Sequence, residues 1–275
     1  MTSNQPSSPI VSMTDTSVSP FLDTTRPNTA RIFNYLLGGT ANFEIDRQAA
    51  DEMLKVLPLL DKWVRIRHAF VQEAAQTLYK EGFRQFLDLG SGMPTEDHMH
   101  AFLTDAHIVY SDINPVAVSY GNSLFANLDK VAYIHGNVLA TETILETTAV
   151  RRLFEPQQKT AVGLNSVSIF ISTEDHKRLS QALYDWAAPG SQIFVLFQTL
   201  EQTTEQYEQF LAINSQAGLP IQLYSFAEMT DLLSPWQITH SEPVAKFLGL
   251  PDDYIRESDK ANFGFSFNAV FLTKN

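Results

Sequence analysis

The sequence predicts an α/β fold with one mostly parallel sheet of seven strands, flanked by helices and preceded by an N-terminal helical lid. Three observations support this prediction. Strand-length apolar runs alternate with helical or polar segments from residue 83 onward, which is typical of parallel sheets covered by helices on both faces. A glycine-rich turn at residues 90–92 directly follows the first apolar run. Residues 26–82, ahead of that run, carry helical periodicity.

The N-terminal part divides into a tail and a lid. Residues 1–25 are rich in Ser, Thr and Pro and lack a sustained apolar period, so we expect a disordered tail. Residues 26–82 are expected to form the helical lid, because apolar residues recur there at helical spacing. The segments with this spacing are residues 34–37, 49–60 and 61–79.

Residues 83–275 are expected to form the core, a Rossmann-like domain. Helices are predicted at residues 95–103, 115–128 and 225–233, the last with a capping box from Ser225 to Glu228. A further apolar stretch at 166–171 leaves the end of the fourth strand loosely bounded. Ligands of such sheets bind beyond the carboxyl ends of the strands, where the strand order reverses. The strands are predicted at residues 83–89, 107–111, 131–136, 160–164, 193–197, 236–239 and 265–273.

Composition narrows the classes of function. The formal net charge of −12, without a dense Lys/Arg block, argues against a nucleic-acid partner and favours a small-molecule one. No apolar run approaches the roughly 20 residues of a membrane helix. No signal-peptide pattern begins the chain, and cysteine is absent, so we expect a cytoplasmic protein. We expect no metal, because the pair His98 and His100 lacks further ligands. The sequence leaves open whether the chain forms a homodimer.

The strongest local signal is the run 88–92 (DLGSG) at the end of the first strand. Glycines there permit a tight turn and a close approach of the ligand, so a side chain at Gly90 is expected to fill space that the ligand needs. Asp88 is placed to hold an ammonium group. A dinucleotide site would have a third glycine where Thr95 stands. The alternative is a tight turn with a solvated aspartate. The candidate contacts are Asp88, Gly90, Ser91, Gly92, Pro94 and Thr95.

Polar residues also follow the second and third strands. Asp112 can accept hydrogen bonds from both ribose hydroxyls of an adenosine. NAD enzymes use a carboxylate at the same position, so this residue indicates an adenosine ligand rather than SAM in particular. Asn137 can bond the adenine ring through its amide. The alternatives are an N-cap role for Asp112 and a plain turn role for Asn137. Further candidates beside them are Ile113, Asn114 and Val138.

With these motifs, the chain resembles the class I S-adenosylmethionine (SAM)-dependent methyltransferases. It is similar in particular to a bacterial S-adenosyl methyltransferase family long catalogued as a domain of unknown function. The likeness is good from about residue 27 to 114 and fades through the C-terminal half. It is carried by residues 26–31 (RPNTAR), 34–39 (NYLLGG) and 42–47 (NFEIDR), then by Arg67 and QFLDLGSGMPT.

The resemblance implies a class I fold, SAM as cofactor and transfer of its methyl group to an acceptor. It also implies that the lid folds over the cofactor, whereas the alternative is a helical hairpin that only packs on the sheet. Two interpretations are open for Arg31, Asp46 and Arg67, namely ligand contacts or an internal set of salt bridges; for Arg31 and Asp46 we favour the salt bridge. The contacts expected from the lid are Tyr35, Gly38, Gly39, Phe43 and Arg67.

The C-terminal half departs from the family pattern. A His-containing segment usually follows the fourth strand, but here the sequence reads GLNSVS, with Asn165 as the candidate contact and no histidine before His176. Tyr35 and His176 are the candidate general bases, needed only if the acceptor loses a proton. These departures leave open a SAM-binding sensor or scaffold without transfer. An NAD-dependent oxidoreductase is a third interpretation, which Thr95 disfavours.

Overall fold

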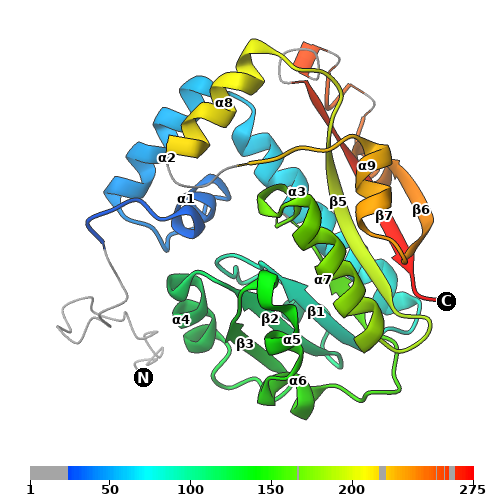
Figure 1. The fold of residues 1–275 in the computed structure, drawn as a ribbon. Coiled ribbons are helices and arrows are strands. Elements are labelled where there is room, and N and C mark those ends of the chain that lie inside the picture. The colour runs from blue at the N-terminus through cyan, green and yellow to red at the C-terminus, as the bar shows by residue number, and fades with distance from the viewer. Residues whose placement is uncertain (1–23, 166, 217–220, 252, 257, 260–263) are drawn as a thin grey trace, which may run out of the picture.

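Among the residues that the computed structural model describes, the sheet has seven strands in the order β3-β2-β1-β4-β5-β7-β6 (Figure 1). The structure describes residues 24–165, 167–216, 221–251, 253–256, 258–259 and 264–275, so the predicted tail at 1–25 lies almost wholly outside it. The strands are β1 (Gln85–Leu89), β2 (His107–Asp112), β3 (Val131–His135), β4 (Ala161–Gly163), β5 (Gln192–Leu200), β6 (Gln237–Pro243) and β7 (Phe265–Thr273).

Strands β1 to β5 pair in parallel, whereas β7 lies antiparallel between β5 and β6. The chain builds β1, β2 and β3 outward in one direction and then crosses back to place β4 on the other side of β1. The strand order therefore reverses between β1 and β4, and ligands of such sheets bind beyond the carboxyl ends of the strands at that point. The predicted mostly parallel sheet with flanking helices is confirmed.

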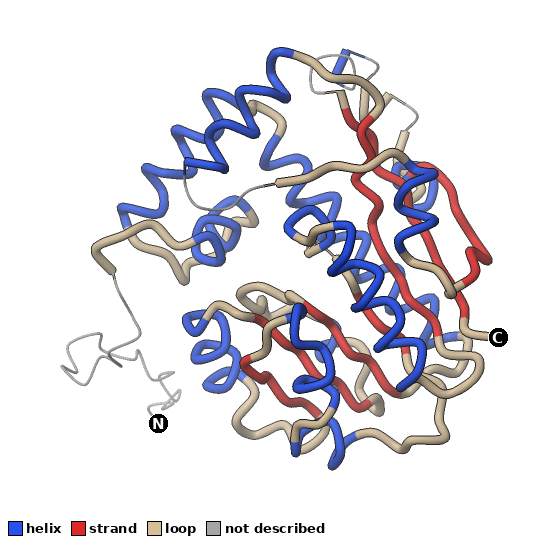
Figure 2. The backbone as a smooth tube through the Cα atoms, in the orientation of Figure 1, coloured by secondary structure: helices blue, strands red, loops and turns tan. Residues whose placement is uncertain are grey.

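Helices cover both faces of the sheet, as the blue and red segments of Figure 2 show. Successive strand residues point to opposite faces. Phe86 thus packs in a core with α1 and α3, and its neighbour Leu87 packs in a second core with α7 and α9. No helix of the described ranges is both long and apolar enough to cross a membrane. The helices are α1 (Thr29–Leu36), α2 (Glu44–Val56), α3 (Leu60–Lys80), α4 (Pro115–Leu124), α5 (Thr141–Leu145), α6 (Thr148–Leu153), α7 (Thr173–Trp186), α8 (Glu205–Gln216), α9 (Phe226–Leu232) and α10 (Val244–Phe247).

The N-terminal helices α1 and α2 are joined by a buried ion pair. Arg31 Nε lies 2.7 Å from Asp46 Oδ2, and the two side chains are 1% and 0% exposed. The internal salt bridge expected from the sequence is therefore confirmed. The division of the chain into a lid at residues 26–82 and a core at 83–275 stays a prediction.

Two predicted elements of the core are wrong. Residues 95–103 contain a single 3₁₀ turn, Met99–Ala101, because the His98 ring accepts a hydrogen bond from Thr95 N and closes a local turn instead of a helix. Residues 167–171, the described part of the apolar stretch after β4, do not form a strand, and Ser168–Phe170 forms another 3₁₀ turn; Ser166 lies outside the described residues. Hydrogen bonds from His176, Gln222 N and the Tyr224 hydroxyl hold carbonyls of this segment, so they are not available to a sheet.

Candidate functional site

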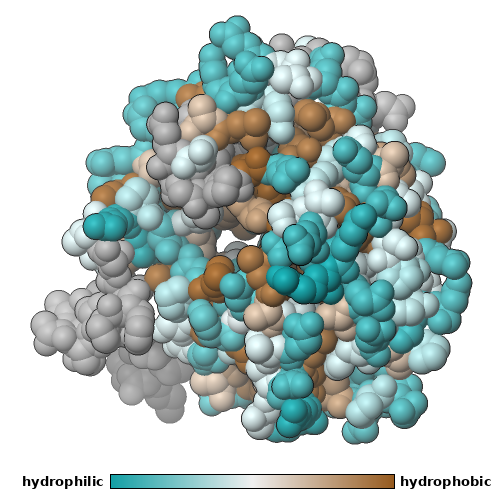
Figure 3. Space-filling view, in the orientation of Figure 1, coloured by the Kyte–Doolittle hydropathy of each residue, from teal (hydrophilic) through white to brown (hydrophobic). Residues whose placement is uncertain are grey.

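A cavity lies between the N-terminal helices and the carboxyl ends of β1 and β4. It holds about 530 Å³ of empty space, its opening to solvent included. The space-filling view shows a hollow near the centre of the molecule, between the regions of α1 and α4 (Figure 3). The cavity is lined by Ala30, Phe33, Asn34 and Leu37 of the α1 region, Arg67, His68 and Val71 of α3, and Asp88, Gly90, Ser91, Gly92, Met93, His98 and Asn165.

The glycine turn closes one side of this cavity. Gly90 and Gly92 both have φ of 71°, a left-handed conformation that favours glycine. A Cβ atom on Gly92 would meet nothing within 4 Å, but one on Gly90 would overlap Val167 Cγ1. The side chain of Val167 therefore fills the space where a Cβ atom on Gly90 would lie, and the open position belongs to Gly92. Gly90 itself lines the cavity, so a ligand contact at Gly90 stays a prediction.

A carboxylate and a guanidinium face the same cavity. Asp88 is 3% exposed, and burial raises its pKa to about 7, although a Ser91 hydrogen bond and the charge of Arg67 lower it. Burial lowers the pKa of Arg67 to about 10, against the opposing effect of the Asp88 and Asp112 charges. Arg67 Cζ also lies 4.9 Å from the centre of the Phe33 ring. At neutral pH the site therefore presents a cation beside an acid that is close to its titration point.

Asn165 adds a hydrogen-bond donor without a partner. Its Oδ1 accepts from Leu196 N at 3.1 Å, whereas its buried Nδ2 makes no hydrogen bond with any described residue. A Cβ atom on Gly163 would lie 2.5 Å from Asp88 Oδ1 and 3.2 Å from Asn165 Nδ2, so both groups lie over that glycine. An unpaired buried donor is costly, and a polar ligand in the cavity would remove that cost.

Asp112 lies beside the cavity, and its carboxylate organises the turn. Its Oδ2 accepts from Gly92 N and its Oδ1 from Asn114 N, both at 2.8 Å. Burial raises the pKa of Asp112. Asn114, not Asp112, is the N-cap of α4, since its side chain accepts from Val116 N. Ile113 between them is 58% exposed, so an apolar surface stands next to the carboxylate.

The remaining predicted cofactor residues do not line the cavity. Asn137 Oδ1 accepts from Leu139 N at 3.0 Å and so caps a 3₁₀ turn. Thr95 bonds His98 through both its backbone N–H and its hydroxyl. Phe43 lies under Arg31, whose Cζ is 5.1 Å from the ring centre. Cofactor contacts stay a prediction for the candidates that line the cavity, and equally for Tyr35, Gly38, Gly39, Phe43, Pro94, Thr95, Asp112, Ile113, Asn114, Asn137 and Val138.

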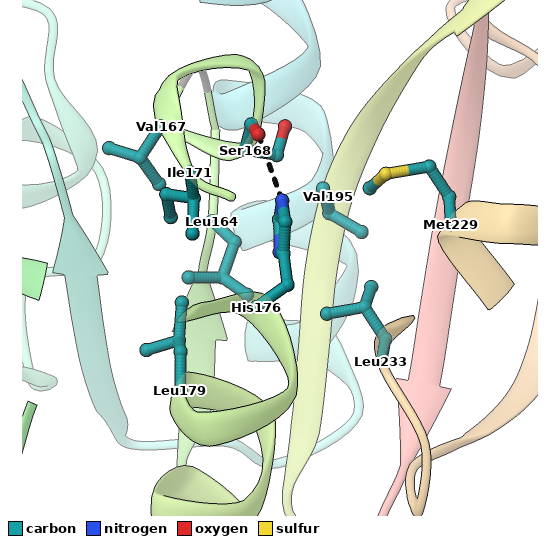
Figure 4. Close-up of a pocket in the computed structure, with 9 residues that line it drawn as sticks. All are labelled: Leu164, Val167, Ser168, Ile171, His176, Leu179, Val195, Met229 and Leu233. Atoms are coloured by element: carbon teal, nitrogen blue, oxygen red, sulfur yellow. Dashed lines mark hydrogen bonds between the residues drawn. The ribbon is translucent and has the colours of Figure 1, made fainter. Parts of the chain in front are cut away.

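His176 belongs to a different pocket, which the close-up shows (Figure 4). Its Nε2 lies 2.9 Å from the carbonyl oxygen of Ser168, and its buried Nδ1 has no partner among the described residues. Apolar side chains such as Leu164 and Val195 surround the ring (Figure 4), and burial lowers its pKa. The contact gives His176 a structural task in holding the segment after β4. A role as general base stays a prediction.

Several lining residues were not among the sequence candidates. Ala30, Phe33, Asn34 and Leu37 are spaced three, one and three residues apart on one helix face, a periodicity that the sequence contains. His98 was considered only as a metal ligand, yet it lines the cavity beside His68. The three-residue spacing from Thr95 to His98 is the feature of the sequence that could have indicated the turn, and this turn positions the His98 ring.

Comparisons with known proteins show the family and the fold that this chain shares. A family model described as S-adenosyl methyltransferase matches residues 15–256. A protein of Thermobifida fusca YX described as a methyltransferase is 27% identical, with a TM-score of 0.80 over 93% of this chain and 98% of its own. A DUF574 family protein of Streptomyces avermitilis MA-4680 is 23% identical, with a TM-score of 0.80 over 92% and 99%.

More distant structures share the fold. Geranyl diphosphate C-methyltransferase of Streptomyces coelicolor A3(2), in complex with Mg²⁺, geranyl diphosphate and S-adenosyl-L-homocysteine, is 14% identical, with a TM-score of 0.52 over 91% of this chain and 88% of its own. A search of curated proteins finds no match.

Proposed function

The chain belongs to the S-adenosyl methyltransferase family, and from this premise we propose that it methylates a small molecule, with the amino-acid end of SAM in the cavity between α1, α3, β1 and β4. SAM-dependent methyl transfer is the activity of this family. The acceptor and the placement of the cofactor are the proposal, and the residues of the cavity support it.

The cavity's charges fit the amino-acid end of SAM, which carries an ammonium and a carboxylate. Asp88 offers a carboxylate for the ammonium, and a positive ligand group would favour its ionised form. Arg67 and the unpaired Nδ2 of Asn165 offer donors for the carboxylate, since guanidinium groups bind carboxylates strongly. This set of one acceptor and two donors around one cavity is the observation that carries the proposal.

The adenosine would continue from this cavity toward the ends of β2 and β3. Asp112 stands next to Gly92 through the hydrogen bond to its backbone N–H, so a ribose that passes the glycine turn would meet that carboxylate. The exposed Ile113 provides an apolar surface for the adenine ring. Asn137 and Val138, on the adjoining turn, complete the proposed nucleoside contacts.

When bound, SAM would supply the methyl group of its sulfonium. A nucleophilic acceptor would attack that methyl carbon in line with the bond to sulfur, and S-adenosylhomocysteine would leave. The protein's own task is to align the reactants and to exclude water. Asp88, Arg67 and Asn165 would orient the cofactor's tail, and α1 and α3 would cover it. A proton acceptor is required only for acceptors that lose a proton, with Tyr35 and His176 as the first candidates.

The net charge of −12 favours a small-molecule acceptor, because nucleic-acid binding depends on clustered cations. The test is incubation of the protein with labelled SAM and with bacterial extract divided into small-molecule, protein and nucleic-acid fractions. We expect label in the small-molecule fraction, and none with the Asp88→Asn variant. Label confined to protein or nucleic acid, or absent from every fraction, would contradict the proposal.

A further inference from the structure

We propose that His98 determines the cofactor specificity of this site, by donating a hydrogen bond from Nε2–H to the carboxylate of the amino-acid tail. This inference rests on the proposed cofactor site and adds a residue that neither the sequence motifs nor the comparisons assign. A ligand that keeps the adenosine but lacks the tail would gain nothing from His98.

The hydrogen bonds of the ring define which nitrogen carries the proton. His98 Nδ1 lies 3.2 Å from Thr95 N and 2.9 Å from Thr95 Oγ1. A backbone N–H is a donor in every state, so Nδ1 must accept. In a neutral imidazole the proton then lies on Nε2, which makes this atom a donor.

The His98 ring lies at the wall of the cavity. The His98 side chain is 8% exposed and lines the cavity, with its ring centre 5.5 Å from that of Tyr110 and 5.7 Å from that of His68. Within the described part of the chain, Nε2 makes no hydrogen bond, yet it is not among the fully buried polar atoms without a partner. In the proposal, this atom donates into the cavity that the His98 side chain lines.

The chemistry of the ring suits a neutral donor. Burial, together with the nearby His68, lowers the pKa of His98 to about 3, so the ring is uncharged at neutral pH. The Nε2 atom of His68 already has partners within the protein, because it lies 3.1 Å from both Asp97 Oδ2 and Gln72 Nε2. Arg67 thus brings the charge for a carboxylate, and His98 brings a directed hydrogen bond.

The test compares two ligands by calorimetry: S-adenosylhomocysteine (SAH), which has the tail, and 5′-methylthioadenosine, which lacks it. In the wild-type protein SAH should bind more tightly. His98→Phe keeps an aromatic ring of similar size without a donor. It should weaken SAH by about 10- to 100-fold, the usual effect of a hydrogen bond to a charged group, and leave 5′-methylthioadenosine within about twofold.

His100→Phe is the matched control. His100 meets Phe125 edge to face, with ring centres 4.6 Å apart, and is not among the residues that line the cavity, so this variant should bind both ligands as the wild type does. His98→Gln retains an N–H near the Nε2 position and should recover part of the SAH affinity. Binding of 5′-methylthioadenosine reports in each case that the variant is folded.

A second measurement needs no variant. In ¹⁵N-histidine NMR of the wild-type protein, His98 and His176 should both be in the neutral Nε2–H form at pH 6, and one of these two imidazoles should shift with SAH but not with 5′-methylthioadenosine. An unchanged SAH affinity in His98→Phe, or an equal loss for both ligands, would overturn the inference alone. Failure of the wild-type protein to bind SAH would overturn the proposed function together with it.

Discussion

Asn28 and Asn114 hydrogen-bond each other through their side-chain amides, and each caps the N-terminus of a helix at the same time. Asn114 Nδ2 donates to Asn28 Oδ1 at 2.9 Å, and Asn28 Nδ2 donates to Asn114 Oδ1 at 3.3 Å. Asn28 caps α1 and Asn114 caps α4. Because Asn114 N also bonds Asp112, the pair ties the N-terminal helices to the turn that carries the proposed ribose contact.

The first prediction concerns this pair. Asn28→Ala removes a cap and the link to α4, so we expect a loss of about 2 kcal/mol in the free energy of unfolding, more than the roughly 1 kcal/mol of a cap alone. Thr147→Ala is the control, since Thr147 caps α6 through Val150 N. Urea unfolding of Asn28→Ala, Asn114→Ala and the double variant should give a coupling of at least about 0.5 kcal/mol; strictly additive losses would show that the link is not stabilising.

The second prediction concerns the buried ion pair. Arg31→Met leaves Asp46 without its cation at a fully buried position, and breaking such a pair costs about 3–5 kcal/mol. Asp46→Asn should cost less, because Asn28 N and Phe43 N can still bond the amide oxygen. Urea unfolding at pH 7 measures both; a loss below about 1 kcal/mol in Arg31→Met would contradict the account.

The stability that this ion pair contributes should be lost in acid. Burial alone would raise the pKa of Asp46, but hydrogen bonds from Arg31, Phe43 and Asn28 outweigh it and leave the pKa lowered. A lowered folded-state pKa gives stability that is present above the unfolded value, about 4, and is lost as the pH falls through the folded one. Stability measured below pH 4 should therefore decline less steeply in Asp46→Asn than in the wild-type protein.

The third prediction concerns Asp88, whose pKa is shifted in the opposite direction to that of Asp46, so that its effect on stability changes with pH in the opposite sense. Its folded-state pKa of about 7 lies above the unfolded value of about 4, so the folded state keeps a proton that the unfolded state has released. This group therefore lowers stability progressively as the pH rises from about 4 to 7. Compared with the wild type, Asp88→Asn should be more stable at pH 8 and no more stable at pH 4 in urea unfolding.

Cofactor binding should be linked to the same proton. The ammonium of SAM favours ionised Asp88, so binding near pH 6 should release a proton, and the affinity should rise between pH 6 and 8. Calorimetry in two buffers of different ionisation enthalpy measures this release. Binding at pH 6 without proton release, or a release that persists in Asp88→Asn, would argue against contact between Asp88 and the ammonium.

The fourth prediction separates the two glycines of the turn. Alanine at either position suffers the strain of positive φ, about 1 kcal/mol. At Gly90 it also overlaps Val167, so Gly90→Ala should lose more stability, and Gly90→Ala with Val167→Ala should recover part of it. Gly92→Ala places its Cβ in open space and should lower SAH affinity more than stability. Equal effects at both positions, by urea unfolding and SAH titration, would contradict this distinction.

The strands could be predicted from the sequence because most of them are buried on both faces and read as apolar runs. β7 has the bounds expected for it, and the capping box at Ser225 begins α9 as predicted. Residues 95–103 could not be predicted by pattern, because a side-chain hydrogen bond from Thr95 N to His98 competes with the helix. The helix α7, missed in the sequence, follows Ser172 as its N-cap, with two acidic residues in its first turn.

The site was only partly predictable for the same reason. Asp88 could be identified because a motif places it at a strand end, and Arg67 through the family resemblance. The cavity wall contributed by α1 depends on how that helix packs over the sheet, and the occupant of the space beside Gly90 depends on the segment after β4. Neither follows from local sequence, since both are contacts between distant parts of the chain.

The most direct test of the account is a crystal structure of the protein with SAH. We predict that the amino-acid tail lies between α3 and the end of β1, with its carboxylate bonded by Arg67 and its ammonium by Asp88. A tail bound elsewhere, with these two side chains still facing each other across a cavity without it, would contradict the central claim.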